Sequence, residues 1–181
     1  MRLFWRHGYE GVSIGDLTKA IGIAPPSLYA AFGSKTGLYQ EALARYEGSI
    51  GLLDFAAVAE ASGLPQAVRL LLEAAVGAVT HPDRERGCMI SSGMITCHPD
   101  HATLARDLAA RRDAIRAKIA EALRPFADAG TIPGLARHLA AVMQGISIQA
   151  RDGIGRAELQ GIVEDVVAGL DRRQLRGQAR Q

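Results

Sequence analysis

Residues 13–35 read SIGDLTKAIGIAPPSLYAAFGSK, and the local signals in this stretch decide the fold. They predict two short helices joined by a tight turn. In the first helix Ile14, Leu17 and Ile21 recur at helical spacing, which places them on one buried face. Gly22 follows that helix and can adopt the left-handed conformation that is common at helix ends.

Capping signals fix where each helix begins. Ser13 is expected to cap the first helix, with Asp16 three residues on completing a capping box. Pro25 and Pro26 open the second helix, because two prolines fit only in a first turn. The residues expected to face inward are Leu28, Ala31 and Phe32. The residues expected to face outward are Ser27, Tyr29 and Ala30. Gly33 ends this helix, and Ser34 is expected to cap a third.

Two short helices at a steep angle are typical of a helix-turn-helix, whose second helix enters the major groove of DNA. Small and polar side chains on the second helix would allow a close approach to base edges. Ser13 and Tyr29 can donate hydrogen bonds to phosphates, and Lys35 can pair with one. The alternative is an ordinary three-helix part of a helical bundle, since helices joined by turns are common.

The wider stretch GYEGVSIGDLTKAIGIAPPSLYAAFGSKTGLY resembles the DNA-binding module of the TetR (tetracycline-repressor-like) family of bacterial transcription regulators. The resemblance includes Gly8-Tyr9, A-I-G-I at residues 20–23, L-Y-x-x-F at residues 28–32 and S-K-x-x-L at residues 34–38. It implies an all-α protein: an N-terminal three-helix helix-turn-helix domain, then an all-helical domain that dimerises and binds a ligand. By position, it implies that Pro25, Pro26, Ser27 and Tyr29 face the DNA and that Ser13 and Lys35 hold phosphates.

The first helix differs from the family pattern. Members usually begin with a longer helix preceded by a basic tail, whereas this sequence starts at MRLFW, so about two helical turns are expected to be absent. An alternative function is therefore a dimeric small-molecule-binding protein with an impaired DNA-binding domain.

Composition favours helix, since aromatic residues make up only 5% of the 181 residues. Residues 1–47 hold five basic and four acidic side chains, a net charge of +1, so charge alone does not indicate a DNA-binding protein. The sequence has no apolar run long enough to cross a membrane and no visible signal peptide, which predicts a cytoplasmic protein without membrane contact. Cys88 and Cys97 are expected to stay reduced.

The rest of the chain is expected to be helical. We place the domain boundary between residues 48 and 49, so the domains span residues 1–48 and 49–181. The predicted helices cover residues 35–49, 65–80, 99–129, 131–152 and 156–173, while residues 53–63 are ambiguous. The resemblance makes residues 87–97 a short buried central helix.

The last two helices carry more apolar surface than one antiparallel pair can bury, which predicts a homodimer. Together with the resemblance, this implies binding to a palindromic double-stranded DNA operator. The alternative is that both apolar stripes form the core of a monomer. The resemblance also implies an apolar cavity for an effector, with Met89, Met94 and Cys97 as its adaptable wall. The residues expected to supply its other parts are His101, Met143 and Gln144. Such a lining suits a small lipophilic or aromatic compound.

No catalytic group or cofactor is predicted. Cys88, Cys97, His98 and His101 are the only cluster of metal-type ligands in the sequence. Their spacing matches no common structural-zinc pattern, so no metal is predicted, and a metal or redox sensor is kept as an alternative.

Overall fold

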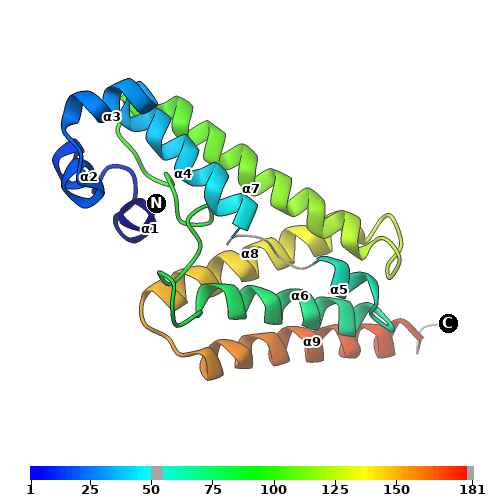
Figure 1. Ribbon diagram of the computed structural model, residues 1–181. Helices are drawn as coiled ribbons and strands as arrows, with labels where there is room; N and C mark the ends of the chain where they lie inside the picture. Colours follow the sequence, from blue (N-terminus) through cyan, green and yellow to red (C-terminus); the bar gives the residue numbers. More distant parts are fainter. Residues whose placement is uncertain (50–54, 179–181) are drawn as a thin grey trace. The chain divides into compact units, whose positions relative to one another are not determined.

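The computed structural model describes residues 1–49 and 55–178, and the side chains of residues 1–48 and 55–170. Within these ranges the chain is helical and has no strand, as predicted (Figure 1). The α-helices are α1 Arg2–His7, α2 Ile14–Ile21, α3 Pro25–Phe32, α4 Lys35–Ser49, α5 Phe55–Ala59, α6 Leu64–Val79, α7 Ala102–Leu123, α8 Ile132–Arg151 and α9 Arg156–Gln178. A 3-10 helix, η1 Pro99–His101, precedes α7. Residues 53 and 54 of the ambiguous stretch lie outside the described residues.

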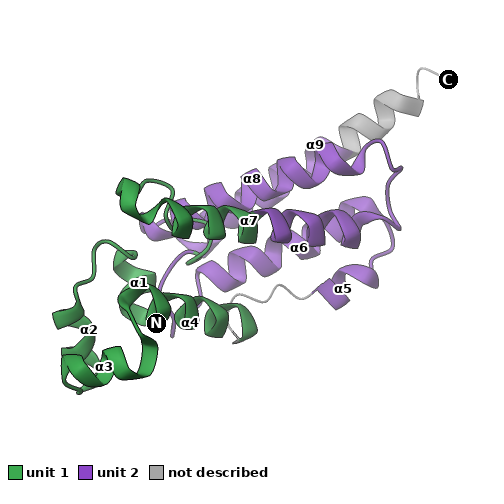
Figure 2. Ribbon diagram, turned by 90° about the horizontal axis from the view of Figure 1, so that it is seen from above, with its two compact units in different colours: residues 1–52, 88–112 green, residues 53–87, 113–181 purple. Residues whose placement is uncertain are grey.

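The chain forms two compact units (Figure 2). Unit 1 comprises Met1–Leu52 and Cys88–Arg112, and unit 2 comprises Leu53–Gly87 and Asp113–Gln181. The segment Cys88–Arg112 therefore packs with the N-terminal helices although 35 or more residues separate it from them in sequence. The domain boundary predicted at residues 48 and 49 remains a prediction.

Aromatic side chains form the core of unit 1. The ring of Phe4 meets that of Tyr39 edge-on at 4.9 Å, and Trp5 meets Tyr46 in the same way at 4.9 Å. Tyr9 also packs against Tyr39, with 5.3 Å between ring centroids. Burial raises the pKa of Tyr39 to about 12, so its hydroxyl stays protonated. These contacts fix α1 and the residues after it against α4.

In unit 2, α6 lies beside both α8 and α9 (Figure 1). Its apolar stripe is buried: Val68, Leu71, Leu72, Ala75, Val76 and Val79. The Arg69 guanidinium on α6 pairs with the Glu164 carboxylate on α9. A helix that packs on two sides in this way supplies much of the apolar surface of the unit.

The predicted central helix over residues 87–97 is wrong, because the segment consists of turns. The Arg112 guanidinium donates hydrogen bonds to the carbonyl oxygens of Ile90 at 3.0 Å and of Gly93 at 2.9 Å. Met94 has a left-handed φ of 52°, and the Ile95 side chain is 64% exposed rather than buried. Partners outside the segment thus satisfy carbonyls that a helix would have bonded internally.

Several boundaries and orientations also differ from prediction. The helix expected over residues 99–129 begins as a 3-10 turn and ends at Leu123, because Pro125 lacks the N–H that a helix needs there. The last helix continues to Gln178, five residues beyond the predicted end. Ile21 and Ala31, expected to face inward, are exposed, since Leu17 and Leu28 already supply the buried contacts of their short helices.

Candidate DNA-binding surface

The capping box predicted at the start of α2 is confirmed. The Ser13 hydroxyl accepts a hydrogen bond from the Asp16 backbone N–H at 3.1 Å and donates one to the Asp16 carboxylate at 2.6 Å. The same carboxylate oxygen accepts the Ser13 backbone N–H at 2.8 Å. These bonds to Ser13 hold the pKa of Asp16 below its ordinary value of 3.8. The start of α2 is therefore fixed by two residues close in sequence.

The turn and the start of α3 place this short helix at the surface. Gly22 takes the left-handed conformation (φ 80°, ψ 30°), and Pro25 and Pro26 occupy the first turn of α3. Leu28 is 0% exposed and anchors α3 to the rest of the unit, whereas Tyr29 is 48% exposed. Four of the residues predicted to face DNA are exposed: Pro25, Pro26, Ser27 and Tyr29. The outer face of α3 is accordingly not covered by the described part of this chain.

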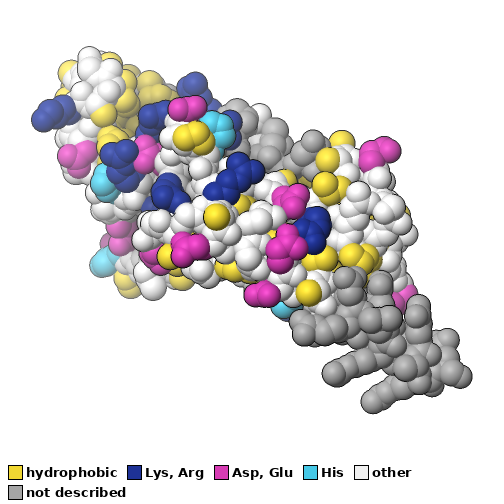
Figure 3. Space-filling model, turned by 90° about the horizontal axis from the view of Figure 1, so that it is seen from below, with side chains coloured by type: hydrophobic (Ala, Val, Ile, Leu, Met, Phe, Trp, Pro, Cys, Tyr) yellow, Lys and Arg dark blue, Asp and Glu magenta, His cyan; other side chains and the backbone are white. Residues whose placement is uncertain are grey.

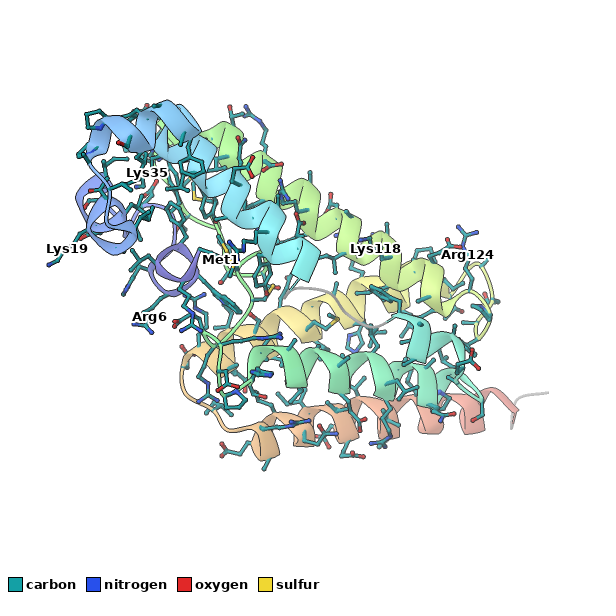
Figure 4. The ribbon with its side chains drawn as sticks, viewed as in Figure 1. Met1, Arg6, Lys19, Lys35, Lys118 and Arg124 are labelled. Atoms are coloured by element: carbon teal, nitrogen blue, oxygen red, sulfur yellow. The ribbon has the colours of Figure 1, made fainter. Side chains whose placement is uncertain are left out.

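Lys35 is the first residue of α4, the helix that follows α3 (Figure 4). Its Nζ lies 4.3 Å from the centroid of the Tyr9 ring, within the range of a cation–π contact. The Tyr9 hydroxyl shares a 2.8 Å hydrogen bond with the Thr36 hydroxyl, which holds the ring in place. Burial lowers the pKa of Lys35, and the nearby Glu10 carboxylate opposes that shift. The lysine therefore presents a positioned ammonium.

Residues from η1 complete this cluster. The Glu10 Oε1 accepts the His98 backbone N–H at 2.7 Å and contacts the His101 Nδ1 at 2.9 Å. These two contacts lower the pKa of Glu10 below its ordinary value of 4.5. The His101 ring also meets Tyr9 edge-on at 4.9 Å. Tyr9 thus touches both Lys35, predicted to bind phosphate, and His101, predicted to line an effector site.

The sequence alone did not reveal the roles of Tyr9 and Glu10. Tyr9 belongs to the Gly8-Tyr9 pair that carried the resemblance, which was the available signal. Glu10 meets partners 88 and 91 residues away, so no local pattern indicates its role.

A family described as "Bacterial regulatory proteins, tetR family" matches residues 1–42. The HTH-type transcriptional repressor ComR of Escherichia coli (strain K12) is 32% identical over 169 residues, covering 90% of this chain and 80% of ComR. The chain belongs to the TetR family. The HTH-type transcriptional repressor BdcR of the same organism is 32% identical, covering 83% of this chain and 75% of BdcR.

A solved structure of a TetR-family regulator has a similar fold. A cysteine mutant of the TetR family transcriptional regulator CifR, complexed with 26-bp double-stranded operator DNA, is 35% identical with a TM-score of 0.86. The match covers 92% of this chain and 91% of CifR. The TetR-family chain described here is thus a transcription regulator rather than an enzyme.

On the face of this TetR-family protein that Figure 3 shows, basic and acidic side chains are mixed rather than gathered by sign. On the helix-turn-helix, Lys19 is exposed at the last turn of α2 and extends away from the helix (Figure 4). This surface can therefore bind DNA through its shape and a few positioned cations rather than through a large basic patch.

The residues predicted to bind the effector are divided between the two units. In unit 1, Met89 and Met94 are buried, while Cys97 and His101 are half-buried. In unit 2, Met143 and Gln144 are half-buried on α8. Whether these residues form the effector site of this TetR-family protein remains a prediction.

Within the described residues, no three His, Cys, Asp or Glu side chains are grouped as a metal site would require. His98 and His101, kept as sensor candidates, instead contact Asp100 at 3.3 Å and Glu10 at 2.9 Å. Among the described helices, none is long and apolar enough to cross a membrane.

Unit 2 has a groove of about 1150 Å³ between the loop before α8, α8 itself and α9. Its apolar lining includes Phe126, Leu135, Ile162, Val166 and Leu170, and its polar lining includes His138 and Asp165. None of the residues predicted to bind the effector lines this groove.

Proposed function

We propose that this TetR-family protein is a ligand-responsive repressor that binds a palindromic operator as a homodimer and is released by a small lipophilic or aromatic effector. The observation that carries the proposal is the position of α3: its buried Leu28 anchors the helix to unit 1, while Ser27 and Tyr29 on its other face are exposed to solvent. Its counterpart CifR has been solved on operator DNA, and ComR and BdcR are named repressors.

Within this function, α3 reads the bases, with Pro25, Pro26, Ser27 and Tyr29 on the DNA side. Lys35 pairs with a phosphate next to the groove, because the Tyr9 ring holds its ammonium at the start of α4. Ser13 is the weaker phosphate candidate. Its hydroxyl already donates to Asp16, and that anionic carboxylate would stand close to the phosphate.

Dimerisation has both a geometric and a structural reason. Two recognition helices reach successive major grooves only when about 34–36 Å apart, which requires two copies. The groove lined by Ile162, Val166 and Leu170 on α9 offers apolar surface to a second copy. The candidate effector-binding residues stay those predicted from the sequence: Met89, Met94, Cys97 and His101 in unit 1, and Met143 and Gln144 in unit 2.

The test is fluorescence anisotropy with a labelled duplex from the region upstream of the protein's own gene and a scrambled duplex of equal length. Lys35→Met keeps the stem over Tyr9 but removes the charge. It should weaken binding to both duplexes alike and lower the slope of log K against log salt by about one. Ser27→Ala should change the preference at one base pair, by roughly fivefold.

Lys118→Met is the matched control, because Lys118 is exposed on α7 within unit 2. It should leave operator affinity unchanged. Equal binding of the wild-type protein to the operator and the scrambled duplex at low salt would refute the proposed function.

A further inference from the structure

The Lys35 ammonium has a potential anionic competitor inside its own protein. Glu10 is exposed and belongs to the same cluster as Lys35: the Tyr9 ring lies 4.3 Å from the Lys35 Nζ and 4.9 Å from the His101 ring, and His101 contacts the Glu10 carboxylate at 2.9 Å. A DNA phosphate and this carboxylate would compete for the same cation, with the modest strength of an ion pair near the surface. Whatever restrains Glu10 therefore influences how available Lys35 is.

The restraint on Glu10 comes from His98 and His101, at the two ends of η1. One carboxylate oxygen, Oε1, receives both the His98 backbone N–H at 2.7 Å and the His101 ring nitrogen at 2.9 Å. His101 is in turn placed by its edge contact with Tyr9. We propose that His101 is a positioning residue for DNA binding, which holds the Glu10 carboxylate so that the Lys35 ammonium remains available to a phosphate.

This proposal rests on the proposed role of Lys35 and adds the residue that controls it. It also gives His101 a task other than lining an effector cavity. The charged groups around the pair are Lys35 at the start of α4, and His98, directly before η1, with Asp100 on η1, which contact each other at 3.3 Å. The contact requires the neutral His101 ring to carry its proton on Nδ1, or the ring to be protonated on both nitrogens.

Removing the restraint should change operator affinity in a defined direction. In His101→Ala the Glu10 carboxylate keeps the His98 backbone N–H but loses the imidazole, so it can rotate toward Lys35, and operator binding weakens by up to about fivefold, the range of an exposed ion pair. Glu10→Gln removes the competitor and binds the operator as tightly as the wild type or more tightly. The double variant His101→Ala/Glu10→Gln recovers the affinity of Glu10→Gln.

A conservative variant separates positioning from packing. In His101→Asn the side-chain amide N–H can take the place of the Nδ1 donor, so the affinity should stay within about twofold of the wild type. His81→Ala, in unit 2, is the histidine control and should have no effect. Trp5, the only tryptophan of the chain, is buried in unit 1, so its fluorescence reports whether each variant folds.

The outcomes are distinguishable. If the wild-type protein does not prefer the operator, the proposed function itself fails. If it does, but folded His101→Ala binds as tightly as the wild type, the positioning role is overturned. It is likewise overturned if Glu10→Gln does not rescue His101→Ala, or if His101→Asn binds as poorly as His101→Ala.

Discussion

Two stretches of unit 1, residues 13–35 and residues 88–101, share several residue types but are held in place by different partners. Both are short and contain glycine, proline and serine. In the first stretch the fixing bonds are local: Ser13 with Asp16, the Gly22 turn, and Ser34 with Gly37 at 3.0 Å. The second also has local bonds, such as that from the Ser92 hydroxyl to the Cys88 carbonyl at 2.9 Å, but it receives further bonds from distant residues, Arg112 and Glu10.

The difference shows which contacts determine the conformation of each stretch. Capping hydrogen bonds form between residues that are close in sequence, so the helices within residues 13–35 are determined by that segment itself. The conformation of residues 88–101 depends also on Arg112 of α7 and on Glu10 in the loop after α1. The second stretch is therefore the one that can sense changes elsewhere in unit 1, and His101 connects it through the Tyr9 ring to Lys35 at the end of the first.

The largest effect is expected from removing the buried anchor of the first stretch. Leu28→Ala deletes a side chain that is 0% exposed, and should cost about 3 kcal/mol of unfolding free energy. Urea unfolding followed by Trp5 fluorescence measures it. Ile95→Ala, an aliphatic truncation in the second stretch at a site 64% exposed, should change the free energy by less than about 0.5 kcal/mol. Equal losses would contradict this contrast.

Sequence reasoning succeeded where order is local. The bounds of α2, α3 and α4 match the predicted helices, because capping serines, paired prolines and terminal glycines act within a few residues of each other. It failed over residues 87–97, where Arg112, outside the segment, donates hydrogen bonds to the Ile90 and Gly93 carbonyl oxygens. No periodicity in that segment encodes such a partner.

The candidate site follows the same division. The exposed face of α3 and the position of Lys35 were predictable, since both follow from helix register. The Tyr9 contact with Lys35 and the Glu10 contact with His101 were not, because each depends on packing between residues far apart in sequence. Burial of Ile21 was predicted wrongly, since periodicity identifies a face but not whether another helix covers it.

An intermediate effect is expected from releasing the second stretch. Arg112→Met keeps an apolar stem but leaves the Ile90 and Gly93 carbonyls without the guanidinium, at a cost of about 2 kcal/mol. Hydrogen exchange of the amides of residues 89–94 should become faster while exchange in α3 stays unchanged. Arg116→Met, which loses only the 2.9 Å pair with exposed Asp113, should cost less than about 0.5 kcal/mol. Faster exchange in α3 as well would show that the two stretches are not held independently.

The smallest effect distinguishes two caps within the first stretch. Ser13→Ala and Ser34→Ala each remove a capping hydroxyl and should each cost about 1 kcal/mol near neutral pH. Only the Ser13 cap includes a carboxylate, that of Asp16, whose pKa is lowered in the folded state. A lowered pKa means that the contribution is present above the ordinary value of 3.8 and is lost as the pH falls through the folded value. Urea unfolding between neutral and acidic pH should therefore show the cost of Ser13→Ala shrinking on acidification while that of Ser34→Ala stays constant, and parallel curves would mean that Asp16 adds nothing to the cap.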